Sequence, residues 1–589
     1  MNLPTVNEWN PALDMIREFR GYDHRPVILP GEWYAMENLT SAHYPLMAPR
    51  QRRTKWRTLT KPNGLFAREK LMWVDGTDFY YNGYPQGTVE DSKKQFVAMG
   101  AYILIFPDKV YFNTDTAEFG SLEHKTVSHE PVSYVMVKGD GREYPAPHVG
   151  DTAPENPESG DTWVDTSASP HVLKVYGTDM WLSAPTTATR ITSKDIGKGY
   201  RKGDGVTLSG SKLPGMNGDF VLLSATDDSV TVTALIDEWT SQGTDAPITL
   251  SREVPDMDYV VELDNRLWGC SSANHEIYAS KLGDPFNWRV YEGISTDSYA
   301  ASVGTPGPFT AAASHLGYVL FFKEDVIHKV YGTKPANFQI VTTRGRGVAE
   351  GSHKSVATVQ ETLYYHSAAG ICAYDGSLPR SVSEVFGDEH YESAVAGALG
   401  DKYYAALMKA GSSNLFVYDA AKGLWHREDG LDVMDFAALD NRMYALTKNG
   451  EIWELTGAII GEGSGERSAS DFSRSASDFS RSESDFPKPE GPVSWFAETG
   501  DLGLETPMKK TVLKLILRLT MAADAYLKVL LEYDSGLWEE RCLITTDRPR
   551  SFALPILPRR CDRLRLRLEG RGEVRLYSLA KVTEEGSEL

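Results

Sequence analysis

A hairpin pattern that recurs along most of the chain constrains the fold more than any other feature. Each copy has an apolar strand, a polar turn and a second strand that ends near an aromatic residue and often an Asp or Gly. Helical periodicity is almost absent, so the chain is predicted to be all-β. About seven copies occur. They begin at Lys70, Tyr102, Arg266, Tyr318, Thr362, Lys402 and Arg442.

The spacing of the copies indicates the architecture. From Arg266 onward they start roughly 40 to 52 residues apart, close to the length of a four-stranded propeller blade. We therefore predict a β-propeller of about six to seven blades. Stacked β-sandwiches would show the same alternation of strands and Asn or Gly turns, and they remain the alternative. The copies lack the WD40 and kelch signatures, so no standard repeat class is indicated.

Composition divides the chain into five predicted segments. Residues 1–137 and 255–457 are assigned to the propeller. Residues 138–254 contain a Pro, Gly and Asp-rich run and then short alternating strands, which predicts a small β-module inserted between two blades and facing outward. Residues 458–492 hold three imperfect Ser/Asp/Phe copies and are predicted to be a flexible linker. Residues 493–589 are predicted to form a C-terminal β-sandwich.

The net charge of −20 is unevenly distributed over the 589 residues. Residues 491–589 hold 16 Lys and Arg against 15 Asp and Glu, so residues 1–490 hold 45 against 66 and carry −21. A net negative charge argues against a protein that wraps nucleic acid, because such binding depends on positive side chains that release counterions from the phosphates. The acidity belongs to the large N-terminal part.

Local motifs for catalysis or cofactor binding are missing from the sequence. The four cysteines have no C-x-x-C spacing, the thirteen histidines form no H-E-x-x-H, and the glycine-rich GKGYRKGDG run lacks a GK[ST] ending. We therefore expect no catalytic residues, no cofactor and no metal, and predict that the chain is not an enzyme. Propellers do host glycosidases whose catalytic groups come from distant blades. No apolar run is long enough for a membrane span, and no secretion signal is expected.

Residues 563–568 alternate Arg and Leu, which predicts a strand with one buried face and one basic face. The basic face could bind phosphate groups. A solvated face or a protein interface is favoured, because glutamates stand nearby in sequence and the domain charge is close to zero.

The segment Tyr259–Gly293 resembles a motif of tailed-phage tail propellers, D-x-R-[LV]-W-x-[SC]-S, then [IV]-Y-x-S, then L-G-D-P-x-[ND]-[WF]. It is similar to the tail tubular protein B, or nozzle, family of short-tailed phages. The segments Tyr44–Arg53 and Phe321–Gly332 agree with this family as well. The matched positions are Asp264, Arg266, Trp268, Ser271, Tyr278, Ser280, Gly283, Asp284, Pro285, Asn287 and Trp288.

The resemblance implies a virion structural protein that assembles in the host cytoplasm into a homo-oligomeric tail ring, expected to be a hexamer. Its implied partners are other tail or head-tail adaptor proteins and double-stranded DNA in passage at ejection. The motif is interpreted as architecture: Trp268 fills a space between blades, and Gly283, Asp284 and Pro285 make the turn to the next blade. The alternative function is a glycan-binding adhesin at the tail tip.

Overall fold

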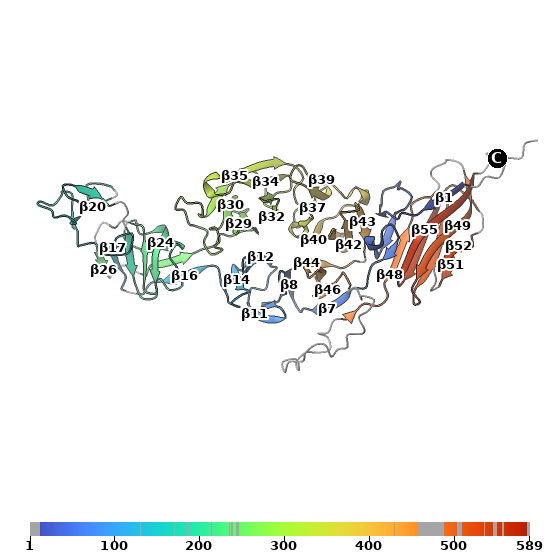
Figure 1. The fold of residues 1–589 in the computed structure, drawn as a ribbon, viewed down its shortest axis with the longest axis horizontal. Coiled ribbons are helices and arrows are strands. Elements are labelled where there is room, and N and C mark those ends of the chain that lie inside the picture. The colour runs from blue at the N-terminus through green and yellow to red at the C-terminus, as the bar shows by residue number, and fades with distance from the viewer. Residues whose placement is uncertain are drawn as a thin grey trace, which may run out of the picture. The chain divides into compact units, whose positions relative to one another are not determined.

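The protein is almost entirely built of β-strands, as the computed structural model in Figure 1 shows. The chain divides into two compact units. Unit 1 comprises Met1–Lys93, Phe322–Val326 and Arg344–Leu589, and unit 2 comprises Lys94–Phe321 and Ile327–Thr343. The structure describes residues 12–585 except 130, 170, 185–187, 214, 235, 237–239, 243–246, 429, 458–487, 503–508, 535, 546–549 and 557–558.

The helical elements among these residues are single 3-10 turns, and none of them is long and apolar enough to cross a membrane. The prediction of an all-β propeller with an inserted β-module and a C-terminal β-sandwich is confirmed. The number of blades stays a prediction. The 3-10 turns are η1 (Ser41–His43), η2 (Pro335–Asn337), η3 (His353–Ser355) and η4 (Glu384–Phe386).

Blade-type sheets in unit 1 are antiparallel meanders with hairpin turns. Three of them use consecutive strands. They are β8 (Pro62–Ala67), β9 (Leu71–Asp75), β10 (Asp78–Tyr81) and β11 (Tyr84–Thr88); β36 (Ala357–Val359), β37 (Thr362–Ser367), β38 (Gly370–Tyr374) and β39 (Arg380–Ser381); and β40 (Ser393–Leu399), β41 (Lys402–Lys409), β42 (Ser412–Asp419) and β43 (Leu424–Arg427).

A further blade of unit 1 combines strands from both ends of the propeller sequence. The strand β7 pairs antiparallel with β46, and β47 pairs with the other edge of β7. The predicted linker therefore ends in a strand at residues 488–489, while residues 458–487, with the Ser/Asp/Phe copies, lie outside the described residues. The strands are β44 (Val433–Leu439), β45 (Arg442–Thr447), β46 (Glu451–Glu454), β7 (Thr54–Thr58) and β47 (Lys488–Pro489).

Blade-type sheets of the same kind recur in unit 2, together with a sheet whose β33–β34 turn is assigned to unit 1. Their central strands are apolar because both faces are covered, as the buried run of β13 illustrates. The strands are β12 (Gln95–Met99), β13 (Tyr102–Phe106), β14 (Val110–Asn113) and β15 (Phe119–Ser121); β28 (Tyr259–Leu263), β29 (Arg266–Ser271), β30 (Glu276–Ala279) and β31 (Tyr299–Ser302); and β32 (Ala311–His315), β33 (Tyr318–Phe322), β34 (Val326–Tyr331) and β35 (Gln339–Arg344).

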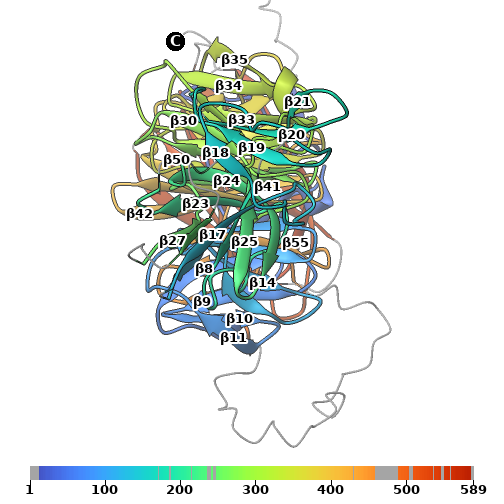
Figure 2. The same ribbon diagram turned by 90° about the vertical axis from the view of Figure 1, so that its left-hand side faces the viewer.

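The inserted module of unit 2, several of whose strands are labelled in Figure 2, consists of an eight-stranded sheet and a four-stranded sheet around one core. The larger sheet has the order β16-β27-β23-β24-β25-β22-β17-β26. The strands are β16 (His124–Val127), β17 (Ser133–Val137), β22 (Ala188–Thr192), β23 (Gly205–Ser209), β24 (Gly218–Thr226), β25 (Ser229–Val232), β26 (Thr240–Gln242) and β27 (Thr249–Arg252), with β18 (His148–Gly150), β19 (Thr162–Asp165), β20 (Val172–Tyr176) and β21 (Trp181–Ser183) in the smaller sheet.

The module begins earlier than the predicted boundary at residue 138. Its first strand, β16, pairs with its last strand, β27, and β17 pairs with β22. Residues 124–137 therefore belong to the module and not to the propeller. The sequence could not show this, because β16 and β17 have the same alternation as blade strands and their partners lie far along the chain.

The C-terminal sandwich contains two sheets, with orders β1-β55-β49-β52 and β4-β48-β54-β50-β51, and β53 also pairs with β49. Alternate residues of β49, β50 and β54 fill its core, as period-2 strands require. The strands are β1 (Ala12–Ile16), β4 (Ala35–Glu37), β48 (Ser494–Glu498), β49 (Lys510–Met521), β50 (Tyr526–Tyr533), β51 (Trp538–Ile544), β52 (Arg550–Ala553), β53 (Arg559–Cys561), β54 (Leu564–Arg571) and β55 (Val574–Glu585).

The strands β1 and β4 belong to this sandwich, which corrects their assignment to the propeller. β1 pairs with β55 and β4 pairs with β48. The short pairs β2 (Gly21–Tyr22) with β3 (Glu32–Trp33), and β5 (Leu39–Thr40) with β6 (Ala48–Pro49), connect these strands to β7. Pairing across more than 400 residues leaves no local signal in the sequence.

Removal of the module tests the corrected boundary. We expect that replacing residues 124–252 by a short Gly/Ser link leaves the blades folded, because the cost of loop closure changes slowly with length. Replacing only residues 138–254 would leave β16 and β17 without β27 and β22, and this variant should be less soluble. Soluble yield and far-ultraviolet circular dichroism compare the two. Equal behaviour, or a better result for the 138–254 deletion, would contradict the observed boundary.

Candidate functional site

The motif singled out in the sequence lies in the blade β28–β31. Asp264 and Asn265 form the β28–β29 turn, both with positive φ (53° and 58°). This conformation matches a two-residue hairpin turn, for which Asp and Asn are suited. Tyr278 on β30 is buried, and its hydroxyl donates to Glu276 at 2.6 Å. Burial raises the pKa of Tyr278 to about 12.

Arg266 on β29 holds the connection between β30 and β31. Its side chain is buried, and the guanidinium donates to the backbone carbonyls of Ser280, Asp297 and Ser295. The carboxylate of Asp297 in turn accepts hydrogen bonds from the backbone N–H groups of residues 292–294. Burial lowers the pKa of Arg266. These contacts give the arginine an architectural role.

The Gly283-Asp284-Pro285 segment also lies in the β30–β31 connection, inside one blade. The expectation that it makes the turn to the next blade is therefore wrong. Trp288 is buried and donates from Nε1 to the carbonyl of Pro285 at 3.0 Å. Asn287 is buried and donates to Asp284 at 2.6 Å. The segment folds back on itself.

The same connection anchors the inserted module. Asn287 donates to Asp204 at 3.0 Å and accepts from the backbone N–H of Gly205 at 2.8 Å. Asp204 also pairs with Arg252 at 2.8 Å. A Cβ on Gly205 would lie 2.6 Å from the carbonyl oxygen of Arg289, so only glycine permits this approach. The sequence reasoning matched Asn287 but missed its partner, which lies in the module.

Lys109, in the β13–β14 turn, contacts both chain crossings into the module. Its Nζ lies 2.8 Å from Glu123, 2.7 Å from Asp256 and 2.7 Å from the carbonyl oxygen of Val254. One cation therefore bridges the segment that enters the module and the segment that leaves it.

Trp268 lies between the sheets β28–β31 and β32–β35. Its side chain is 4% exposed and shares a core with Val319, Phe321 and Val330. Its ring centroid lies 4.9 Å from that of Phe338, edge to face. Such pairs add stabilisation to the burial of apolar area.

Trp268→Ala is expected to lower the free energy of unfolding by about 3 to 5 kcal/mol, because it removes a large buried aromatic side chain. Thermal and urea unfolding measure this loss. Tyr84→Ala, at a residue that is 60% exposed, is the matched control and should leave the midpoint near that of the wild type. An unchanged midpoint for Trp268→Ala would contradict the packing between the two sheets.

The basic face of β54 is neutralised within the sandwich. Arg565 pairs with Asp501 at 2.7 Å, and Arg567 lies 3.3 Å from Glu498. Arg565 also lies over the ring of Tyr34 at 5.0 Å. The stripe therefore serves an interface between the sandwich sheet and the N-terminal segment. Its arginines already have carboxylate partners, which weakens the phosphate-binding interpretation.

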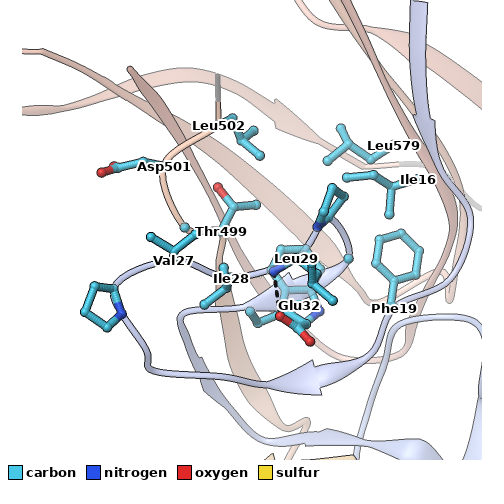
Figure 3. A pocket seen from close by; sticks show the side chains of 15 residues that line it. Ile16, Phe19, Val27, Ile28, Leu29, Glu32, Thr499, Asp501, Leu502 and Leu579 are labelled. Atoms are coloured by element: carbon cyan, nitrogen blue, oxygen red, sulfur yellow. Dashed lines mark hydrogen bonds between the residues drawn. The ribbon is translucent and has the colours of Figure 1, made fainter. Parts of the chain in front are cut away.

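An apolar hollow of about 280 Å³ opens beside the sandwich, and we call it the edge hollow (Figure 3). Its walls come from the end of β1, the loop between β2 and β3, the segment after β48, and β55. The loop side chains Val27 and Leu29 are 75% and 55% exposed. The wall residues include Ile16, Phe19, Val27, Ile28, Leu29, Thr499, Leu502 and Leu579.

A second hollow of about 350 Å³, the polar pocket, lies at the β37–β38 turn and the β39–β40 connection. Arg346, His366, Glu389 and Tyr391 are among its wall residues. The Tyr391 hydroxyl donates to Glu389 at 2.6 Å, and Lys409 lies 3.1 Å from the same carboxylate. Burial works to raise the pKa of Glu389, but the hydrogen bonds from these two groups outweigh it and hold the pKa below its usual range. The pocket combines donors, acceptors and an aromatic edge.

His366, in the pocket wall, is held neutral. It is buried, its Nδ1 lies 3.0 Å from the Ser352 hydroxyl, and burial lowers its pKa to about 4. Two other histidines of unit 1 behave alike, because burial lowers the pKa of His353 to about 4 and that of His426 to about 3.

These histidines predict a loss of stability in mild acid. The unfolded state binds their protons below a pKa of about 6.5, whereas the folded state resists protonation until about pH 4. As the pH falls through that window, each histidine should therefore reduce the free energy of unfolding by about 1.4 kcal/mol per pH unit. His366→Gln should make the pH dependence from urea titrations shallower, while His390→Gln, at an exposed position, should not. Equal slopes for wild type and His366→Gln would contradict the buried neutral histidine.

Neither hollow was found from the sequence. The edge hollow gathers residues from both ends of the chain, and the polar pocket gathers them from several turns and connections between residues 346 and 407. Among the described residues no group of three or more His, Cys, Asp or Glu is arranged to hold a metal ion.

No protein-family model and no curated protein sequence matches the chain. Several solved structures do match it. BamB from Moraxella catarrhalis is 9% identical, with 68% of this chain and 99% of that chain covered at a TM-score of 0.31. Phage phi92 endosialidase is 11% identical, with 74% of this chain and 64% of that chain covered at a TM-score of 0.20. An exo-β-1,3-galactanase from Phanerochaete chrysosporium is 8% identical, with 54% of this chain and 95% of that chain covered at a TM-score of 0.19. These likenesses concern the fold and assign no activity.

The prediction that this chain is not an enzyme is corrected by these comparisons. The galactanase and the endosialidase among the similar structures are enzymes, so the exclusion of an enzyme does not stand. The missing local motif was a weak ground for exclusion, because a fold of several sheets can bring catalytic groups together from distant segments.

Proposed function

We propose that this chain is a structural protein of a tailed-phage virion, forming a ring in the tail through which double-stranded DNA passes. The observation that carries the proposal is the motif from Asp264 to Trp288. Its residues resemble the nozzle family, and in this chain they build one blade and anchor the module to it. Their side chains hold backbone and fill cores, as an architectural role requires.

Charge supplies a mechanism for passage. The chain carries a net charge of −20, and six copies around one axis would carry on the order of a hundred negative charges. Acidic surfaces that face the passage repel the phosphates of DNA, so the duplex slides without being held.

The same charge predicts that assembly depends on salt. Self-repulsion opposes ring closure, and at about 0.1 M salt the Debye length of about 10 Å leaves it partly unscreened. The isolated protein should be mostly monomeric at low salt, and should form rings at higher salt or when an adjacent tail ring supplies a template. Mass photometry across a salt series, with and without that ring, measures this. A monomer under every condition, or tight DNA binding at about 0.1 M salt, would contradict the proposal.

The position of the chain in the virion tests the function directly. Electron microscopy of purified virions with a label on this chain should place it on the tail axis. A position on peripheral fibres would instead favour the second candidate, a glycan-binding adhesin.

The polar pocket is the observation that favours this second candidate. Its Arg346, Glu389 and Tyr391 offer the mixed donors and acceptors that sugar hydroxyls need. Binding of host-surface glycans, lost in Glu389→Ala and kept in Glu361→Ala at an exposed site on the neighbouring β36–β37 turn, would support it.

A further inference from the structure

The sandwich has two lateral edges with different features. At one edge, β1 and β4 end the two sheets, and the edge hollow opens there. At the other edge, β51 ends one sheet, while β52 and β53 lie along the outer side of β49 in the other sheet. Glu539 of β51 lies 3.4 Å from Arg559 of β53, so these strands share that second edge.

The edge hollow is pre-formed. Ile28 lies against Gly500, where an added Cβ would come within 2.7 Å of the Ile28 side chain. Gly31 has a φ of +93°, and an added Cβ there would lie 2.1 Å from the carbonyl oxygen of Glu18. The backbone N–H of Leu29 donates to Glu32 at 2.6 Å, a contact drawn as a dashed line in Figure 3. The loop therefore holds its exposed apolar side chains in place.

The opposite edge presents exposed leucines. Leu537 precedes β51 and is 70% exposed, and Leu543 on β51 is 59% exposed. Among the described residues no strand pairs with the outer side of β51. An edge strand with exposed apolar residues is a surface prepared for association.

We propose that Leu537 of one copy docks in the edge hollow of the next copy, while Leu543, about 20 Å further along the same edge, packs on the surface beside it. This proposal rests on the proposed ring and names the surface that builds it. A cavity of ~150 Å³ accepts a benzene-sized apolar group, so the edge hollow of about 280 Å³ has room for a leucine side chain.

A second copy is the occupant that the geometry favours. The hollow and the leucines lie on opposite edges of one domain, so the leucines of a chain cannot fill its own hollow. Each copy instead offers its leucines to one neighbour and its edge hollow to the other. Such a head-to-tail contact is heterologous, and it closes into a ring when the rotation between copies permits.

Two variants of the full chain test the proposal. Val27→Glu/Leu29→Glu places charge at the hollow, and Leu537→Glu/Leu543→Glu places charge on the opposite edge. All four residues are more than half exposed, so folding should be kept. Each variant alone should be monomeric by mass photometry under conditions where the wild type forms rings. The control Met180→Glu/Leu182→Glu, at residues 61% and 54% exposed in the module, should form rings as the wild type does.

An equimolar mixture of the two variants gives the sharpest readout. One intact hollow and one intact pair of leucines remain between them, so the mixture should form heterodimers and nothing larger. Rings from either variant, or a mixture that stays monomeric, would overturn the docking surface while leaving the tail ring standing. A wild type that is monomeric in every condition would overturn the ring itself, and this proposal with it.

Cross-linking gives a second measurement that does not depend on weakened assembly. Leu29→Cys/Leu537→Cys should form covalent multimers on mild oxidation, because the two positions meet across copies. Leu29→Cys/Leu182→Cys should not. Three of the four native cysteines are buried and Cys542 is partly exposed, so the wild type supplies the background. Equal cross-linking in both variants would count against the docking surface.

Discussion

The pairing of β7 with β46 is the constraint on which the rest of unit 1 depends. It joins residues 54–58 to residues 451–454, so the last blade is complete only when both ends of the propeller sequence meet. Ion pairs secure the junction: Arg53 pairs with Glu428, both of them buried, and the buried Arg50 lies 2.7 Å from the partly exposed Glu490. Breaking such a buried pair by removing one partner is costly, because the other charge stays desolvated.

This closure also positions the sandwich. The chain on the N-terminal side of β7 supplies β1 and β4 to the two sheets, while β47 beside β7 leads into β48. The backbone N–H of Glu490 donates to the carbonyl of Arg53 at 2.9 Å, so both crossings between blade and sandwich run side by side. The edge hollow follows from this arrangement, because its walls are built by the N-terminal segment on the C-terminal sheets.

In unit 2 a different connection plays the comparable part. The loop between β30 and β31 is held from inside by Arg266 and from outside by the contact of Asn287 with Asp204. The segment from Asp264 to Trp288 thus serves to attach an added module to a blade.

The sequence by itself determined the class of fold, since period-2 strands and Gly or Asn turns allow little else. It also placed the blade motif and the alternating Leu and Arg residues of β54, because these signals are local. Tertiary structure alone decided that β1 and β4 complete the sandwich, that β16 opens the module, and that Asn287 meets Asp204. The physical reason is that strand pairing satisfies backbone hydrogen bonds with any partner of suitable register, so distant pairing leaves no mark on either segment. The edge hollow depends on such pairings and was hidden for the same reason.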